Sequence, residues 1–141
     1  MSRFVVSETI PQPLEAVWAL ASDLSNAPRW MNGVDAMRIE GRGPIEQGSA
    51  LVFVARGAER GSTVAKWEPE RCFALRSVQG GVTATYTYTF EAHGHGSTRV
   101  TLDAVCEFRG AMTLMSPLIG WLVRRTDGGQ LRDLAAAMKE A

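Results

Sequence analysis

The stretch from Thr83 to Ala92, TATYTYTFEA, contains two phenolic hydroxyls that could take part in chemistry. Threonines occupy one parity of this stretch, and the other parity carries Ala84, Tyr86, Tyr88 and Phe90. Successive side chains of a strand point to opposite faces, so the pattern predicts a half-buried β-strand with both tyrosines on its apolar face. A buried tyrosine hydroxyl needs a hydrogen-bond partner. We expect each tyrosine either to bond to a buried polar partner in the core or to contact a bound molecule.

Carboxylates and imidazoles, the usual acid and base groups, are scarce at positions expected to face inward. Glu8 shares its parity with Phe4, Val6 and Ile10, so it points inward unless a bulge before Pro11 turns it outward. A buried carboxylate has a raised pKa and could act as an acid or a base. We expect no other inward carboxylate and no inward histidine.

Three arginines could also meet a ligand. Arg76 has the parity of an outward side chain unless Pro69 shifts the register of its strand. Arg124 and Arg125 belong to the C-terminal helical segment. They are expected either on the surface or at the mouth of a cavity, where they would bind an anionic group.

The sequence contains two further groups of residues that can bind metals. His93 and His95 form an H-x-H pair, but they alternate with glycines in an expected hairpin turn, where both would be exposed. We predict no metal site and no cofactor. Cys72 and Cys106 lack CxxC spacing, and the two alternatives are a pair of buried thiols or one disulfide.

Length and charge limit the classes of function. The 141 residues fit one domain, residues 1–141, with 45% apolar and 21% charged residues. Fifteen basic and fifteen acidic residues give zero net charge, which argues against a nucleic-acid-binding protein. The N-terminus lacks the apolar run of a signal peptide, and no apolar run is long enough to span a membrane. We expect a cytoplasmic protein.

Hydrophobic alternation predicts seven strands connected by short turns. Short turns connect antiparallel neighbours, so the strands form one antiparallel sheet. The expected strands are 4–10, 34–42, 50–56, 62–68, 71–78, 82–92 and 99–108. The inward residues of the last one are Val100, Leu102, Ala104 and Cys106.

Two short helices are expected after the first strand, near residues 14–21 and 27–31, and a long helical segment after Gly110. In that segment, two apolar stripes lie about 120° apart around the helix axis at 100° per residue. Met115, Leu118, Ile119, Leu122 and Val123 form the first stripe, and Leu131, Leu134, Ala135 and Met138 form the second. Gly128-Gly129 lies between them. Either the helix kinks there, or a straight helix changes its buried face along its length.

A strongly curved sheet with one covering helix leaves space between the two layers. A helix about 10 Å wide cannot fill the whole concave face, so a cavity next to it is the expected ligand site. The residues expected to line this cavity are Trp30, Phe53, Trp67, Phe73, Tyr86, Tyr88, Phe90, Leu118 and Leu122.

The chain resembles the SRPBCC superfamily, whose helix-grip fold is shared by START lipid-transfer domains, pollen-allergen-type carriers and polyketide cyclase/dehydratase-like proteins. The resemblance covers the full chain. It rests on ETIPQPLEAVWALASD, RWMNGV, KWEPERCFALRS and TRVTLDAVCEF, the last followed by a long helix. It implies an α+β helix-grip fold, with a curved seven-stranded antiparallel sheet wrapped around the C-terminal helix. Gly128-Gly129 departs from the unbroken helix usual in such proteins.

Three functional hypotheses follow. The first is binding, with possible transport, of a small hydrophobic or amphipathic molecule oriented by Tyr86, Tyr88 and Glu8. The second is a cyclase/dehydratase-like enzyme that uses the same cavity, and the third is a module that binds a partner protein. The expected partner is a small hydrophobic molecule rather than a nucleic acid, with the chain acting as a monomer or homodimer.

Overall fold

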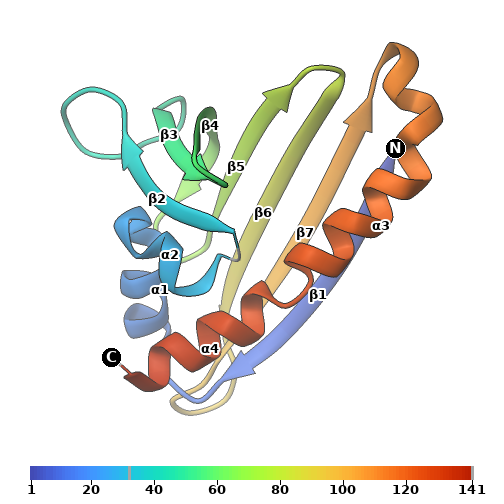
Figure 1. The fold of residues 1–141 in the computed structure, drawn as a ribbon. Helices are drawn as coiled ribbons and strands as arrows, with labels where there is room; N and C mark the ends of the chain where they lie inside the picture. Colours follow the sequence, from blue (N-terminus) through green and yellow to red (C-terminus); the bar gives the residue numbers. More distant parts are fainter. Residues whose placement is uncertain (32, 141) are drawn as a thin grey trace.

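One antiparallel sheet forms the body of the protein (Figure 1). The structure, a computed structural model, describes residues 1–31 and 33–140. Among these residues seven strands pair in the spatial order β1-β7-β6-β5-β4-β3-β2. The strands are β1 (Ser2–Ile10), β2 (Val34–Ile39), β3 (Ala50–Ala55), β4 (Ala58–Glu68), β5 (Cys72–Gln79), β6 (Val82–Ala92) and β7 (Thr98–Phe108).

The hairpin between β3 and β4 is tighter than the sequence suggests. The predicted strands 50–56 and 62–68 leave residues 57–61, GAERG, as a turn, but Ala55 already pairs with Ala58, so the loop consists of Arg56 and Gly57 alone. Both residues have positive φ, 53° and 76°. Positive φ at both central positions is typical of the type I′ turn, which matches the twist of two-residue hairpins. β4 therefore begins four residues earlier than the predicted residue 62.

The inner face of the sheet follows the predicted parity. Val100, Leu102, Ala104 and Cys106 of β7 are all buried. In the register of β6 against β7, Tyr88 lies opposite Leu102 and Phe90 opposite Val100. The tyrosines therefore face inward, as predicted.

The short helices close one end of the sheet (Figure 1). They are α1 (Leu14–Ser22), the 3-10 turn η1 (Leu24–Asn26) and α2 (Ala27–Trp30). Proline fits before or in the first turn of a helix because its missing N–H has no partner there. Pro13 precedes α1, and Pro28 lies in the first turn of α2. The Asp23 carboxylate accepts a hydrogen bond from the Ser25 N–H and caps η1.

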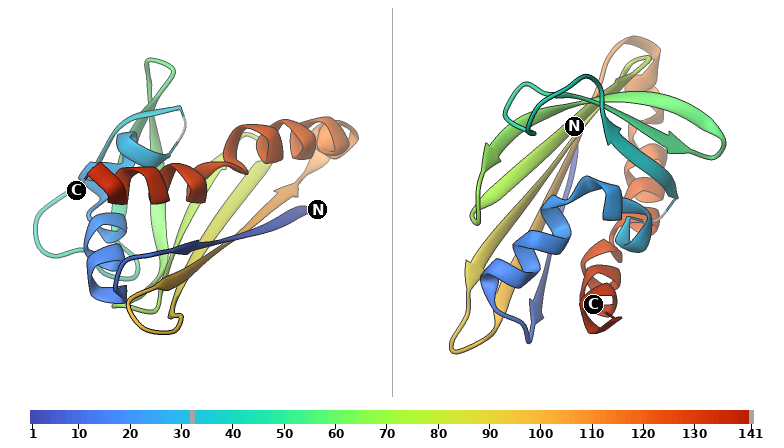
Figure 2. Two further views of the ribbon diagram at one scale, coloured as in Figure 1. Left: turned by 90° about the horizontal axis from the view of Figure 1, so that it is seen from below. Right: turned by 90° about the vertical axis from the view of Figure 1, so that its left-hand side faces the viewer.

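The C-terminal helical segment is divided at the two glycines. After the 3-10 turn η2 (Gly110–Met115), it consists of α3 (Ser116–Asp127) and α4 (Gln130–Glu140), which follow one another along the sheet (Figure 2). The curved sheet and these two consecutive helices together form the helix-grip fold. The Gly128 N–H still donates to the Arg124 carbonyl, and the Gly129 carbonyl accepts from the Asp133 N–H. Of the two alternatives, the structure shows the kink.

The two helices pack against the sheet in different ways. α4 buries Leu131, Leu134, Ala137 and Met138, whereas Gly120 is the buried residue of α3. A Cβ added at Gly120 would lie 2.3 Å from the Ser2 Oγ, so this glycine lets α3 approach the end of β1 closely.

Only part of the first predicted apolar stripe, the one largely in α3, is directed toward the sheet, because its residues Leu118 and Leu122 are exposed. Gly120 and Asp127 lie seven residues apart on one side of α3, and Leu131 and Leu134 of α4 continue the same side. The predicted phase difference arises because Leu118 and Leu122 point outward, while Ile119 and Val123 of the same stripe are half-buried.

These two faces can be tested with matched leucine substitutions. Leu134 is 0% exposed and Leu118 is 49% exposed. Leu134→Ala should lower the free energy of unfolding by about 2–5 kcal/mol, because it leaves a core cavity. Leu118→Ala should change that free energy by about 0.5 kcal/mol or less. Denaturant unfolding of both variants measures the difference, and equal losses would contradict the assignment of the two faces.

Candidate functional site

Aromatic side chains fill the concave face of the sheet next to α1. The Trp18 ring lies 5.4 Å from Trp67 and 5.2 Å from Phe90, measured between ring centroids. Phe73 extends the cluster to Tyr88 at 4.9 Å. Such pairs add to the stability gained from burial alone. This half of the concave face is packed core.

The other half of the concave face contains a half-open cleft of about 260 Å³. It lies between the inner face of the sheet and the break between α3 and α4. Its apolar lining comes from the segment after α2 and from β2, β3, β5 and β6, and includes Met31, Val34, Met37, Phe53, Leu75 and Ala84. Its polar lining includes Arg56, Ser62, Ser77, Asp127 and Gln130 together with Tyr86 and Tyr88. The cleft is therefore mainly apolar, with its polar groups contributed by the sheet and the helix break.

The structure separates the predicted lining residues into three groups. Phe53, Tyr86 and Tyr88 line the cleft. Trp30, Trp67, Phe73 and Phe90 pack in the aromatic core instead. Leu118 and Leu122 lie on the exposed side of α3, away from the cleft.

A chain of hydrogen bonds joins the two tyrosines to the helix break. The Tyr88 hydroxyl donates to the Gln130 Oε1 at 2.5 Å, and the Tyr86 hydroxyl donates to the Asp127 Oδ2. The Gln130 side chain also hydrogen-bonds to the Asp127 carboxylate. Gln130 is only 4% exposed, so its partners replace water. Both tyrosines thus bond to polar partners on the helices, and both also line the cleft.

The Asp127 carboxyl has a pKa above its usual value. Burial causes the rise, because desolvation penalises the charged form, while the hydrogen bonds from Tyr86 and Gln130 and the charge of Arg56 partly offset it. The pKa values of both tyrosine hydroxyls are raised as well, first by burial and then by the nearby charge of Asp127. The tyrosines therefore remain hydrogen-bond donors.

The cation that lines the same cleft comes from the hairpin between β3 and β4. Arg56 occupies the first position of the two-residue turn and lines the cleft. Its positive charge partly offsets the rise that burial causes in the pKa of the Asp127 carboxyl. The cleft thus combines an apolar lining with a carboxyl group, a guanidinium and hydroxyls.

Two polar residues of the cleft, Asp127 and Gln130, were not among the residues that the sequence analysis expected to face inward. No inward aspartate was expected, yet Asp127 faces the cleft, and Gln130 was not considered. A signal was present, because Asp127 precedes Leu131 by four residues and so extends the buried stripe of α4 by one turn. The outward leucines of α3 hid this continuity.

The remaining candidates lie elsewhere. Arg76, Arg124 and Arg125 are exposed, as are His93 and His95. Glu8 is half-buried on the strand face that also carries Phe4 and Ile10, but the described lining of the cleft does not include it. Trp30 lies edge-on to Tyr88, and its buried indole N–H hydrogen-bonds to none of the described residues.

The cysteines are buried free thiols, and burial raises the pKa of both Cys72 and Cys106. Within residues 1–31 and 33–140, no group of three or more His, Cys, Asp or Glu side chains could hold a metal ion. The helices of this part of the chain are also too short or too polar to cross a membrane.

The buried hydrogen bond between Tyr88 and Gln130 can be tested by a double-mutant cycle. Tyr88→Phe leaves the Gln130 oxygen without its donor and should cost about 1–3 kcal/mol of unfolding free energy. Gln130→Leu leaves the Tyr88 hydroxyl unpaired, whereas the double variant leaves neither group unpaired. Denaturant unfolding should therefore give a loss in the double variant smaller than the sum of the single losses. A purely additive result would contradict the bond.

The raised pKa of Asp127 predicts how stability depends on pH. The folded state holds the proton of the Asp127 carboxyl more tightly than the unfolded state does. The protonated carboxyl therefore contributes stability that is fully present below about pH 4, and this stability is lost as pH rises through the pKa of the folded state. Asp127→Asn removes this titration. The variant should therefore gain stability relative to the parent protein as pH rises. Unfolding measured from about pH 3 to pH 8 gives the difference, and a difference that is constant or falls would refute the assignment.

Comparison with known proteins places this geometry among related structures. A START superfamily protein from Mycobacterium smegmatis aligns with a TM-score of 0.80 at 14% identity, over 99% of each chain. The Zhui aromatase/cyclase from Streptomyces sp. R1128 aligns with a TM-score of 0.78 at 15% identity, over 97% of this chain and 93% of that one. A Thermus thermophilus protein aligns with a TM-score of 0.76 at 21% identity, over 98% of this chain and 97% of that one. These similarities establish the fold.

A search of curated proteins finds no match. The family model described as polyketide cyclase / dehydrase and lipid transport matches residues 1–139. The chain therefore belongs to the polyketide cyclase/dehydrase and lipid-transport family.

Proposed function

We propose that the protein binds a small, mostly apolar molecule with one polar end in the cleft beside the helix break. The observation that carries this proposal is the lining itself, which is mainly apolar with a few polar groups from the sheet, the β3–β4 hairpin and the helix break. Ligand sites in proteins commonly have this composition, in which apolar contacts supply affinity and a few polar groups fix orientation. Family membership supports the same class of function.

The size of the cleft limits the ligand. Its volume of about 260 Å³ is slightly below the roughly 300–1,000 Å³ typical of ligand pockets. A molecule with one or two fused rings, or a short chain of similar bulk, suits this volume. Burying its apolar surface stabilises the complex by about 25 cal/mol per Å².

The polar groups favour a ligand that carries both a hydroxyl and a carbonyl. The Asp127 carboxylate accepts hydrogen bonds, so it can receive one from a ligand hydroxyl. The Arg56 guanidinium donates hydrogen bonds and can bind a carbonyl oxygen. Both residues line the cleft, so one oxygenated end of a molecule can meet both.

A cyclase-type enzyme is the second candidate function, and the environment of Asp127 favours it. A carboxyl group with a raised pKa, hydrogen-bonded by Tyr86 in a cleft that an arginine also lines, is suited to proton transfer. In this role Asp127 would exchange a proton with the substrate while Arg56 stabilised an enolate oxygen. The likeness to an aromatase/cyclase supports the same candidate.

Binding can be tested with 2-naphthol as a probe and naphthalene as the comparison. Titration calorimetry should show tighter binding of 2-naphthol, because its hydroxyl can donate to Asp127. Ala84→Leu places extra bulk in the cleft and should weaken binding by roughly tenfold or more. Thr85→Leu is the matched control, because the adjacent residue points to the opposite face. The ligand proposal fails if Ala84→Leu binds both probes as tightly as the parent protein.

The enzyme candidate needs a separate measurement. Cyclisation of a linear aryl β-polyketone probe, followed by absorbance, should be faster with the parent protein than in buffer. Asp127→Asn should reduce kcat by about 10²–10⁴-fold, the usual contribution of an acid or base group, while calorimetry shows retained binding. No rate above buffer would leave binding as the function of the cleft. Unchanged turnover in Asp127→Asn would remove this residue from the mechanism.

A further inference from the structure

The outer side of η2 and α3 carries five exposed apolar side chains. They are Leu114, Met115, Leu118, Trp121 and Leu122, which together form the α3 apolar face. Leu114 is 86% exposed and Trp121 is 55% exposed. Single exposed leucines are ordinary on a soluble protein, but a contiguous group that includes a tryptophan marks an interaction site.

The positions of these residues show that the face is a regular feature of α3. Leu118, Trp121 and Leu122 are three and four residues apart, so they share one side of the helix. The opposite side approaches β1 through Gly120. The helix thus exposes Leu118, Trp121 and Leu122 to solvent, while Gly120 and the partly buried Val123 lie toward the rest of the protein.

The charge around the face is strongly one-sided for a protein of zero net charge. Residues 109–126 contain three arginines, Arg109, Arg124 and Arg125, and no acidic residue. All three arginines are exposed, and none takes part in the salt bridges found among the described residues. The Arg125 guanidinium lies 5.3 Å from the centre of the Trp121 ring. The apolar face is therefore bordered by cations.

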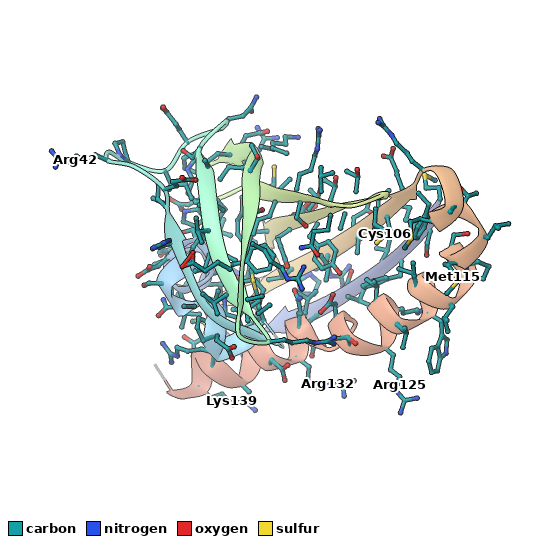
Figure 3. All side chains as sticks on the ribbon, turned by 45° about the horizontal axis from the view of Figure 1, so that its top comes forward. Arg42, Cys106, Met115, Arg125, Arg132 and Lys139 are labelled. Carbon is teal, nitrogen blue, oxygen red and sulfur yellow. The ribbon has the colours of Figure 1, made fainter. Side chains whose placement is uncertain are left out.

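Figure 3 extends this pattern to α4. The labelled Arg125, Arg132 and Lys139 project from the helices on the side away from the sheet. These residues are seven apart, so they follow one side of the helical segment from α3 into α4. Met115 also points outward at the far end of the segment (Figure 3). The outer side thus presents apolar residues at one end and cations along its length.

The positive charge around the α3 apolar face and its small number of apolar residues indicate what kind of partner binds there. A second copy of the chain would bring arginines against arginines, which repel. A stable protein interface uses about 20–30 residues a side, far more than these five apolar residues supply. An anionic lipid surface needs only a narrow apolar strip with cations around it, and it attracts those cations.

We propose that the α3 apolar face docks on an anionic phospholipid membrane. Leu114, Leu118 and Leu122 enter the boundary between headgroups and acyl chains, and Trp121 lies at the interface. Arg124 and Arg125 bind lipid phosphates. The contact is peripheral and reversible, and it leaves the cleft on the other side of the helical segment.

Cosedimentation of the full chain with large unilamellar vesicles tests this proposal. The chain should sediment with vesicles of phosphatidylcholine plus phosphatidylglycerol, much less with phosphatidylcholine alone, and less as salt increases. Arg124→Gln/Arg125→Gln should weaken partitioning by about tenfold or more. Trp121→Ser and Leu118→Ser should weaken it as well. Val78→Ser is the matched control, because Val78 is an exposed apolar residue on β5, and its partitioning should not change.

Three results would overturn the proposal. The first is equal sedimentation with anionic and neutral vesicles, and the second is unchanged partitioning in Trp121→Ser and Leu118→Ser. The third is a concentration-dependent dimer, seen by light scattering, that Trp121→Ser abolishes, because it would assign the face to a second copy. Circular dichroism of each variant confirms that a loss of binding is not a loss of folding. None of these measurements depends on a ligand in the cleft.

Discussion

The hydrogen-bond chain Tyr88–Gln130–Asp127–Tyr86 is the interaction on which the arrangement of the site depends. It joins β6, an interior strand of the sheet, to both sides of the break between α3 and α4. Apolar packing alone would allow these helices to rotate or slide, because it is non-directional. Buried polar groups are costly unless paired, so this chain fixes which helical residues face the tyrosines. The same bonds hold a carboxyl group at the wall of the cleft.

The cleft exists because the two halves of the concave face are filled differently. Next to α1, the rings of Trp18, Trp67, Phe73 and Phe90 occupy the space that a single helix cannot fill. Beyond Tyr88, the lining changes to smaller residues such as Ala84 and Ser77, and the space stays open. The volume available to a ligand is thus what the aromatic cluster leaves. This division explains why a bulky residue on the inward face of a strand can lie in the aromatic core without lining the cleft.

Much of the fold could be predicted from the sequence, because strand parity and turn residues are local signals. The inward residues of β6 and β7 and the short helices were predicted in this way, and the kink at Gly128-Gly129 was one of the two alternatives that the sequence left open. The contents of the cleft depend on long-range packing and were harder to predict. Asp127 was missed because the leucines of α3 suggested the wrong buried face. Arg56 was missed because the sequence suggested a longer turn, residues 57–61, than the two-residue hairpin of Arg56 and Gly57 that borders the cleft. Trp30 and Phe73 have the expected inward orientation, but contacts with other rings place them in the core.

The break at Gly128-Gly129 separates two helices with unequal attachment to the sheet. Four buried apolar side chains hold α4, whereas α3 has Gly120 against the start of β1 and the partly buried Val123 against the core, with Asp127 at its last position. The carboxyl group inside the molecule therefore belongs to the more weakly attached helix, and the opposite side of that helix is open to the surroundings. A contact on the outer side of α3 that favours one position of this helix therefore also changes the free energy of the Asp127 carboxyl in the cleft. By thermodynamic reciprocity, a ligand in the cleft that favours the same position of α3 strengthens binding at the α3 apolar face by an equal factor.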